Sequence, residues 1–213
     1  MKKTLMCVSL ALLGLSAGCA GGGSGEASTE GTKDSATSAT DPKAAEMAPK
    51  DASLGLVPSS PEGDAVEVLP GLVVTVPEGA VIREPEVADP SVETVTYRMD
   101  GAVDGLPALQ IRSGTGLDIH SQTWLEEQSL NINATITDVH RSVEEWPGAA
   151  QAVAFNWTSE VTTAAGAAKD DVATLWLSTD SGQFYSLTAV APEGELQDSA
   201  VLDALLSAEL VGS

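Results

Sequence analysis

The sequence predicts an α+β domain, built on one antiparallel β-sheet of six to seven strands flanked by two helices. Three observations lead to this fold class. Short apolar segments with alternating or β-branched residues recur between Leu72 and Val190, separated by turns rich in Pro, Gly, Asp and Ser. Only two segments, near Ser121 and near Ser199, carry helical start signals. Strands and helices do not alternate along the chain as they do in parallel sheets, so an antiparallel sheet is expected.

Three strands and a helix are predicted in the first half of the domain. Leu72–Val76 is an apolar strand that stops at a Pro-Glu-Gly turn. Val92–Met99 alternates between two faces, as a half-buried strand does, and Leu109–Arg112 follows an Asp-Gly turn. Ser121 is a favourable N-cap for a helix that continues through Leu130.

The second half is predicted to hold four strands and the closing helix. Ile136–Val143 is rich in β-branched residues, and Ala150–Trp157 follows a Trp-Pro-Gly break. Val172–Ser178 and Gln183–Val190 flank a Thr-Asp-Ser-Gly turn and therefore predict a hairpin. From Ser199 to Leu210 the apolar residues fall on one helical face.

The N-terminus has the features of a bacterial lipoprotein signal. Lys2 and Lys3 precede an apolar run, Leu5–Leu15, which is too short to span a bilayer. Small residues then lead directly to Cys19. We therefore expect residues 1–18 to be removed as a signal peptide and Cys19 to carry the lipid. The alternative is ordinary secretion, with Cys19 in this position by chance.

Residues 19–66 are predicted to be the lipidated cysteine followed by a disordered tether. This stretch is rich in Gly, Ala, Ser, Thr and acidic residues, and no aromatic residue occurs before Tyr97. Such a composition buries too little apolar surface to offset the entropy lost on ordering. All eight aromatic residues lie between Tyr97 and Tyr185. The single globular domain is accordingly expected over residues 67–213.

The chain is strongly acidic, with a net charge of −21. From Glu67 onward there are five basic residues against 23 acidic ones. A domain of this charge repels phosphate backbones and anionic headgroups, so no nucleic-acid partner is expected. Contact with the membrane is therefore expected to depend on the lipid at Cys19.

Four features together resemble the Mog1/PsbP-like fold, and within it the LpqN-type lipoproteins of actinobacteria. They are the entry strand with Val76-Pro77-Glu78-Gly79, the strand led by Pro147-Gly148-Ala149-Ala150, the hairpin turn Thr179–Gly182 and the closing helix. The chain departs from that pattern at Ala80, where such proteins often have a tryptophan. The resemblance implies an α/β/α sandwich that serves as a non-catalytic accessory or binding module of the cell envelope.

No catalytic or metal-binding constellation is apparent in the sequence. His120 and His140 are the only histidines, and His140 with Asp138 is interpreted as a surface pair. No Gly-x-Ser-x-Gly elbow or phosphate-binding loop occurs. Asp170 and Asp171, placed in a predicted loop, lack the ligand number that calcium requires. No catalytic residue, metal ligand or cofactor is therefore predicted.

Trp176 and Phe184 are the candidate ligand-binding residues. If Val153 and Phe155 share the core face with Leu175, the opposite face carries Trp176 and Phe184 among small residues. Such a face would accept an apolar ligand, unless one of the two helices covers it. The sequence leaves both alternatives open.

The function predicted from these observations is that of a lipid-anchored, extracytoplasmic accessory module of the cell membrane. Its expected partner is an envelope lipid or an envelope protein. Two alternatives remain, a surface-displayed hydrolase and a purely structural spacer.

Overall fold

The computed structural model describes residues 47–49, 51, 53–83, 92–103, 105–163 and 166–212. The predicted signal and Cys19 lie outside these residues. One compact unit extends from Glu46 to Ser213. It therefore begins well before the boundary predicted at residue 67, and it includes the second part of the segment predicted as a tether.

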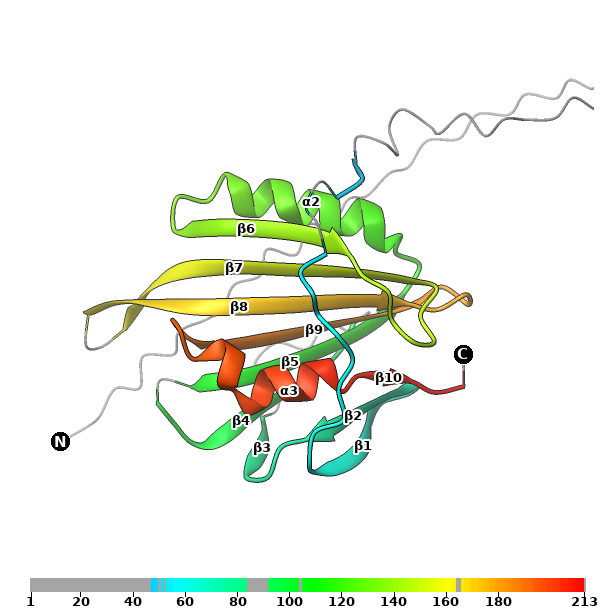
Figure 1. The fold of residues 1–213 in the computed structure, drawn as a ribbon, viewed down its shortest axis with the longest axis horizontal. Helices are drawn as coiled ribbons and strands as arrows, with labels where there is room; N and C mark the ends of the chain where they lie inside the picture. The colour runs from blue at the N-terminus through cyan, green and yellow to red at the C-terminus, as the bar shows by residue number, and fades with distance from the viewer. Residues whose placement is uncertain are drawn as a thin grey trace, which may run out of the picture. The chain divides into compact units, whose positions relative to one another are not determined.

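The main layer is a seven-stranded antiparallel sheet with the order β3-β4-β5-β9-β8-β7-β6 (Figure 1). This confirms the predicted fold class, an antiparallel sheet with two helices. Its strands are β3 (Ala80–Arg83), β4 (Glu93–Val103), β5 (Leu106–Thr115), β6 (Ile136–Val143), β7 (Gln151–Thr163), β8 (Gly166–Ser178) and β9 (Gln183–Pro192).

A second sheet contains three strands in the order β1-β2-β10, namely β1 (Asp64–Leu69), β2 (Leu72–Val76) and β10 (Glu209–Leu210). The predicted entry strand, β2, thus belongs to this small sheet. Side-chain hydrogen bonds tie the small sheet and the chain around it to the large one: Tyr185 Oη donates to Pro70 O at 2.6 Å, and Trp146 Nε1 donates to Ala208 O at 2.8 Å. At Gly71, φ is +83° and a Cβ would lie 2.6 Å from Tyr185 Oη, so only glycine fits this turn.

Helices cover both faces of the large sheet. Helix α2 (Ile119–Asn131) packs on β6, β7 and β8, whereas α3 (Ala200–Leu206) packs on β9, β5 and β2. The N-cap of α2 is Asp118, not Ser121 as predicted, because the Asp118 carboxylate accepts hydrogen bonds from two N–H groups of the first turn. The helix predicted from Ser199 starts there: Ser199 is the N-cap of α3, and the 3₁₀ turn η1 (Leu196–Asp198) precedes it.

Helix α3 is shorter than predicted. It ends at Leu206, and Glu209 and Leu210 form β10 against Val73 and Leu72 of β2. The apolar residues that predicted this helix do form its buried face: Val201, Leu202 and Leu205 are buried in the core beneath α3.

The long β7–β8 hairpin determines which residues share a face. Thr163 pairs with Gly166, and this register sets Val153 opposite Trp176 and Phe155 opposite Thr174. Paired residues lie on the same face, so the supposition that Val153 and Phe155 share a face with Leu175 is wrong. The error arose because the sequence pattern was interpreted as a loop between Trp157 and Val172, where the strands continue.

Two hydrophobic cores result, one on each face of the sheet. The core under α3 and the small sheet contains Leu175, Leu177, Tyr185 and Leu187. The core under α2 contains the residues Ile119, Val153, Phe155, Trp157, Val172, Trp176, Phe184 and Val190. Both faces of the large sheet are thus occupied by packed side chains.

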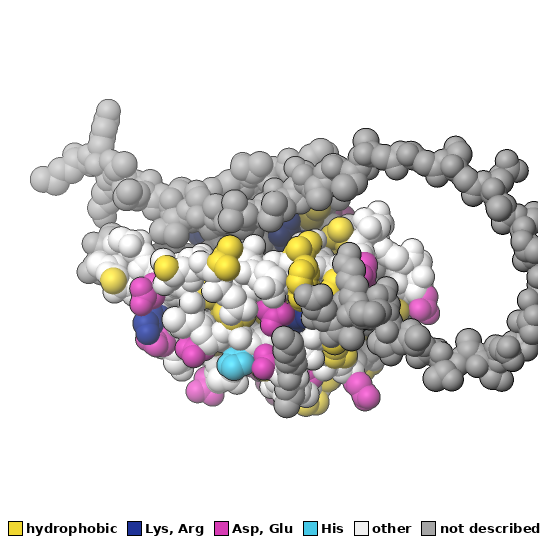
Figure 2. Space-filling model, turned by 90° about the horizontal axis from the view of Figure 1, so that it is seen from above, with side chains coloured by type: hydrophobic (Ala, Val, Ile, Leu, Met, Phe, Trp, Pro, Cys, Tyr) yellow, Lys and Arg dark blue, Asp and Glu magenta, His cyan; other side chains and the backbone are white. Residues whose placement is uncertain are grey.

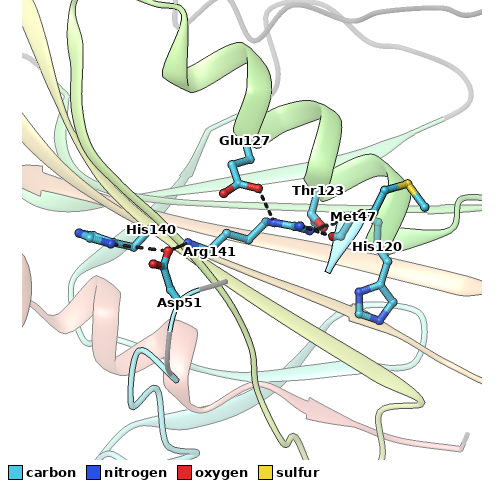
Figure 3. A network of polar contacts seen from close by, with 7 residues as sticks. All are labelled: Met47, Asp51, His120, Thr123, Glu127, His140 and Arg141. Carbon is cyan, nitrogen blue, oxygen red and sulfur yellow. Dashed lines mark hydrogen bonds and ion pairs between the residues drawn. The ribbon is translucent and has the colours of Figure 1, made fainter. Parts of the chain in front are cut away.

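The described residues between Met47 and Leu54, which we call the strap, lie beside the edge strand β6 (Figure 3). Asp51 Oδ2 accepts a hydrogen bond from Arg141 N at 3.0 Å, and Met47 O accepts one from the Arg141 guanidinium. Further along, Leu54 N donates to Glu144 Oε1 at 2.8 Å. The strap therefore supplies polar partners to an edge that would otherwise present unpaired groups.

Arg141 is the largest fully buried polar side chain beneath α2, with an exposed fraction of 0%. Its Nε donates to Glu127 Oε2 at 2.9 Å, and one Nη donates to Thr123 Oγ1 at 3.0 Å (Figure 3). His120 O and Met47 O accept further bonds. The charge is thus paired and hydrogen-bonded, as a buried cation requires.

Candidate functional site

A pocket opens at the β6 edge of the large sheet, beside η1. Its volume is about 240 Å³, which is below the range of about 300–1,000 Å³ typical of sites for drug-sized ligands. Its lining residues come from β6, β7, β8 and the chain around η1: Asp138, His140, Asn156, Trp157, Thr158, Asp171, Val172, Gly194, Leu196 and Gln197.

Strand register brings the polar lining residues together. His140 of β6 pairs with Asn156 of β7, which pairs in turn with Ala173 of β8. One step along, Thr158 pairs with Asp171. Because paired residues share a face, one row of side chains crosses three strands at this edge.

A break in the regular pairing of β6 shapes the edge of the pocket. The pairing of β6 with β7 shifts between Thr137 and His140, and Asp138 has a φ of +56°. Such a left-handed conformation is uncommon for a residue other than glycine, although aspartate tolerates it best. Bulges of this kind redirect side chains and are frequent beside binding sites. Here both Asp138 and His140 line the pocket.

Asp171 forms the polar floor on the β8 side. Its Oδ1 accepts from Thr158 Oγ1 at 3.0 Å, and its Oδ2 accepts from Gly194 N at 2.7 Å. The adjacent Asp170 is buried, and this burial, together with the Asp171 carboxylate, raises the pKa of Asp170. Asp170 and Asp171 thus lie within β8 and not in the loop that the sequence pattern predicted.

Asn156 is the lining residue that carries a buried polar atom without a partner in the described part of the chain. Its Oδ1 is buried but has no hydrogen-bond partner among the residues that the structure describes. A buried acceptor without a partner costs about 1–3 kcal/mol, so most such groups in proteins are satisfied. His140, on the neighbouring strand, instead turns its Nδ1 toward Asp51 Oδ2 of the strap at 3.6 Å (Figure 3).

The predicted ligand residues, Trp176 and Phe184, lie elsewhere, in the core under α2. Their rings stack with centroids 5.7 Å apart, and their exposed fractions are only 7% and 4%. Helix α2 contributes Ile119 and Leu130 to the same core. Of the two alternatives left open, the structure shows the helix-covered face. Ligand binding at Trp176 and Phe184 stays a prediction that requires α2 to move.

Glu126 of α2 extends into this aromatic core. Burial raises the pKa of Glu126 to about 7, while the charge of Arg112 on β5 lowers it by less. In the described part of the chain, neither Glu126 Oε2 nor Trp176 Nε1 has a hydrogen-bond partner. The carboxyl is therefore poised between its neutral and charged forms near neutral pH.

We expect the Glu126 carboxyl to make folding stability fall as pH rises from about 4.5 to about 7. In that interval the native state retains a proton that the unfolded chain has lost. Glu126→Gln should abolish this dependence, and its stability relative to the wild type should grow by on the order of 3 kcal/mol over the interval. Urea unfolding from pH 4.5 to 8 measures the difference. If the free energies of unfolding of the wild type and Glu126→Gln changed in parallel with pH, the prediction would be contradicted. Glu145→Gln, at an exposed position, is the control and should follow the wild type.

On the face that Figure 2 shows, acidic side chains are scattered and basic ones are few, in line with the net charge of −21. None of the pocket's ten lining residues is Lys or Arg. Lys169, on β8 near Asp171, is paired with Glu193 at 3.6 Å. Among the described residues, no group of three or more His, Cys, Asp or Glu is arranged to hold a metal ion. The pocket is thus an acidic site rich in hydrogen-bond acceptors.

The described part of the chain includes no helix that combines the length and apolar character needed to cross a membrane.

Comparison with known proteins adds little to this description. No family model matches the chain, and no curated protein matches it. The solved structure of LpqN, involved in cell envelope biogenesis of Mycobacterium tuberculosis, is similar with a TM-score of 0.41 and 14% identity. That match covers 67% of this chain and 86% of the LpqN chain. A likeness at this level does not establish a family, and the Mog1/PsbP-like membership stays a prediction.

Proposed function

We propose that this protein is a lipoprotein, anchored by Cys19 to the outer face of the cell membrane, whose folded unit binds an envelope component. The anchor rests on the charged start, the short apolar run and the small residues before Cys19. The observation that carries the binding function is the pocket beside η1, whose lining includes Asn156, with a buried Oδ1 that has no hydrogen-bond partner among the described residues.

The pocket chemistry supports a non-catalytic role. Among its lining residues only Thr158 has a hydroxyl, and this hydroxyl donates to Asp171. A hydrolase that acts through a side-chain nucleophile would need that nucleophile hydrogen-bonded to a general base. His140, the one histidine of the pocket lining, faces Asp51 instead. These contacts favour a binding module over a hydrolase of that type.

Cys19→Ser is expected to stop incorporation of radiolabelled palmitate and to leave unprocessed precursor in the cell. The reason is that the thiol of Cys19 is the proposed attachment point. Labelling of cells that express each form, followed by immunoprecipitation, measures both effects. Cys7→Ser, a change within the predicted signal, is the matched control and should retain the label. Undiminished label in Cys19→Ser would overturn the anchor.

The binding function is tested by affinity capture of the tagged, membrane-extracted protein, with analysis of both proteins and lipids. An envelope component retained by the wild type and by Glu145→Gln, but lost from Asn156→Leu and Asp138→Asn, would support the pocket. Equal capture by all four forms would contradict it. Capture of nothing by the wild type would favour the structural spacer.

A further inference from the structure

We infer that the pocket beside η1 binds a protonated alkylamine, with the ammonium inside the pocket and the carbon stem against its apolar wall. This inference rests on the proposed function in that it names the class of ligand for the same site. It is argued from the charge of the lining, the unpartnered acceptor and the size of the pocket.

The charge of the lining selects a cation. Asp138 and Asp171 are the two acidic lining residues, and no Lys or Arg opposes them. The nearby Lys169 is held by Glu193. The acidic surface adds a long-range attraction for cations, and an anionic ligand would be repelled.

The hydrogen-bonding pattern selects a ligand with N–H donors. Asn156 Oδ1 is buried and accepts from no described residue. Asp171 already accepts two hydrogen bonds, so its charge is held in place while Asn156 remains available. An ammonium carries three donors and no acceptor, and therefore matches a lining that contains one unpartnered amide oxygen and two carboxylates. A charge-assisted bond to Asn156 Oδ1 would satisfy the acceptor that the fold leaves open.

Size and shape select an amine on a narrow stem. A volume of about 240 Å³ is too small for a large ring system and suits a chain-like group. Leu196 supplies apolar wall on which methylene groups can pack. A lone metal ion fits less well, because no cluster of three potential ligands occurs in the described residues.

The inference is tested by calorimetric titration of the full-length protein with cadaverine (1,5-diaminopentane), and with 1,5-pentanediol as the uncharged match. We expect cadaverine to bind and the diol to bind at least tenfold more weakly. Raising the salt concentration from 50 to 500 mM should weaken cadaverine binding, because the attraction is electrostatic.

Two pocket variants test the named residues. Asn156→Leu removes the buried acceptor, and Asp138→Asn removes a charge at an exposed position where folding is not at risk. Each is expected to weaken cadaverine binding at least fivefold, while Glu145→Gln leaves it unchanged. Unchanged affinity in Asp138→Asn, equal binding of the diol, or no binding of cadaverine would each overturn the inference.

Two further arms separate the biological sources of an amine. A lysine-containing peptide and phosphatidylethanolamine vesicles are each titrated against the wild type and Asp138→Asn. Binding of either source, lost in the variant, supports the amine and identifies where it comes from. If affinity capture succeeds but cadaverine does not bind, the amine is wrong and the proposed function stands. If cadaverine binds but Cys19→Ser keeps its label, the anchor is wrong and the amine stands.

Discussion

Glu127→Ala is expected to lower the free energy of unfolding by about 3 kcal/mol, because it leaves the Arg141 guanidinium buried without a counter-charge. Arg141 is fully buried, and the Glu127 side chain is 22% exposed. The remaining partners of the guanidinium are neutral oxygens of Thr123, His120 and Met47. For a domain of this size the melting temperature should fall by roughly 6–12 °C. Urea and thermal unfolding at pH 7 measure both quantities.

The double variant Glu127→Leu with Arg141→Met provides the decisive comparison. Removing both charges leaves no uncompensated cation, so the double variant should be more stable than Glu127→Ala despite two changes. Glu145→Ala, an exposed glutamate outside any described ion pair, is the matched control and should stay within about 0.5 kcal/mol of the wild type. A loss below about 1 kcal/mol in Glu127→Ala would show that the neutral oxygens suffice.

Local patterns were sufficient to predict most of the architecture. The alternation in Val92–Met99 corresponds to β4, and the Thr-Asp-Ser-Gly turn joins β8 to β9 as predicted. Helix α3 starts directly after Ser199, close to the predicted start. These features depend on a few neighbouring residues, whose turn chemistry and periodicity are legible without any knowledge of the rest of the chain.

Long-range pairings were beyond these patterns. Whether Val153 faces Trp176 or Leu175 depends on where the β7–β8 hairpin turns, and a one-residue change of register exchanges the two faces. The strap is a similar case. Its residues have the composition of a tether, yet Arg141 and Glu144 lie about 90 residues away in the chain and bind it through hydrogen bonds. Composition alone carries no sign of such distant partners.

The pocket residues were also beyond prediction from local sequence patterns, because strand pairing brings them together. His140 and Asp138 were recognised as a pair from their spacing, but Asn156 and Asp171 reach them only through the pairing of β6, β7 and β8. The bulge at Asp138 depends on a left-handed backbone, for which an aspartate is only a weak signal. The predicted ligand residues were found from their aromatic character, which equally describes a packed core.

Trp176→Ala is expected to lower the free energy of unfolding by about 3–5 kcal/mol, as large-to-small changes in packed cores do. Trp176 is 7% exposed and stacks on Phe184, and the stacking contributes about 0.5–1.5 kcal/mol beyond the buried area. Truncation would leave a cavity between α2 and the sheet that the surrounding side chains fill only in part. Urea unfolding at pH 7 measures the loss. The control is Leu125→Ala at an exposed position of α2, and it should have little effect on the free energy of unfolding.

The same variant distinguishes a packed core from a ligand-binding face. In a core, Trp176→Ala costs stability, and affinity for an uncharged monoacylglycerol is negligible with or without the tryptophan. In a ligand face, long acyl chains should bind the wild type more tightly than short ones, since each buried methylene contributes about 0.8 kcal/mol, and Trp176→Ala should lose that affinity with little loss of stability. The 4–7% exposure of the two stacked rings supports the first result. A stable Trp176→Ala that no longer binds the lipid would instead show that α2 moves aside to admit a ligand.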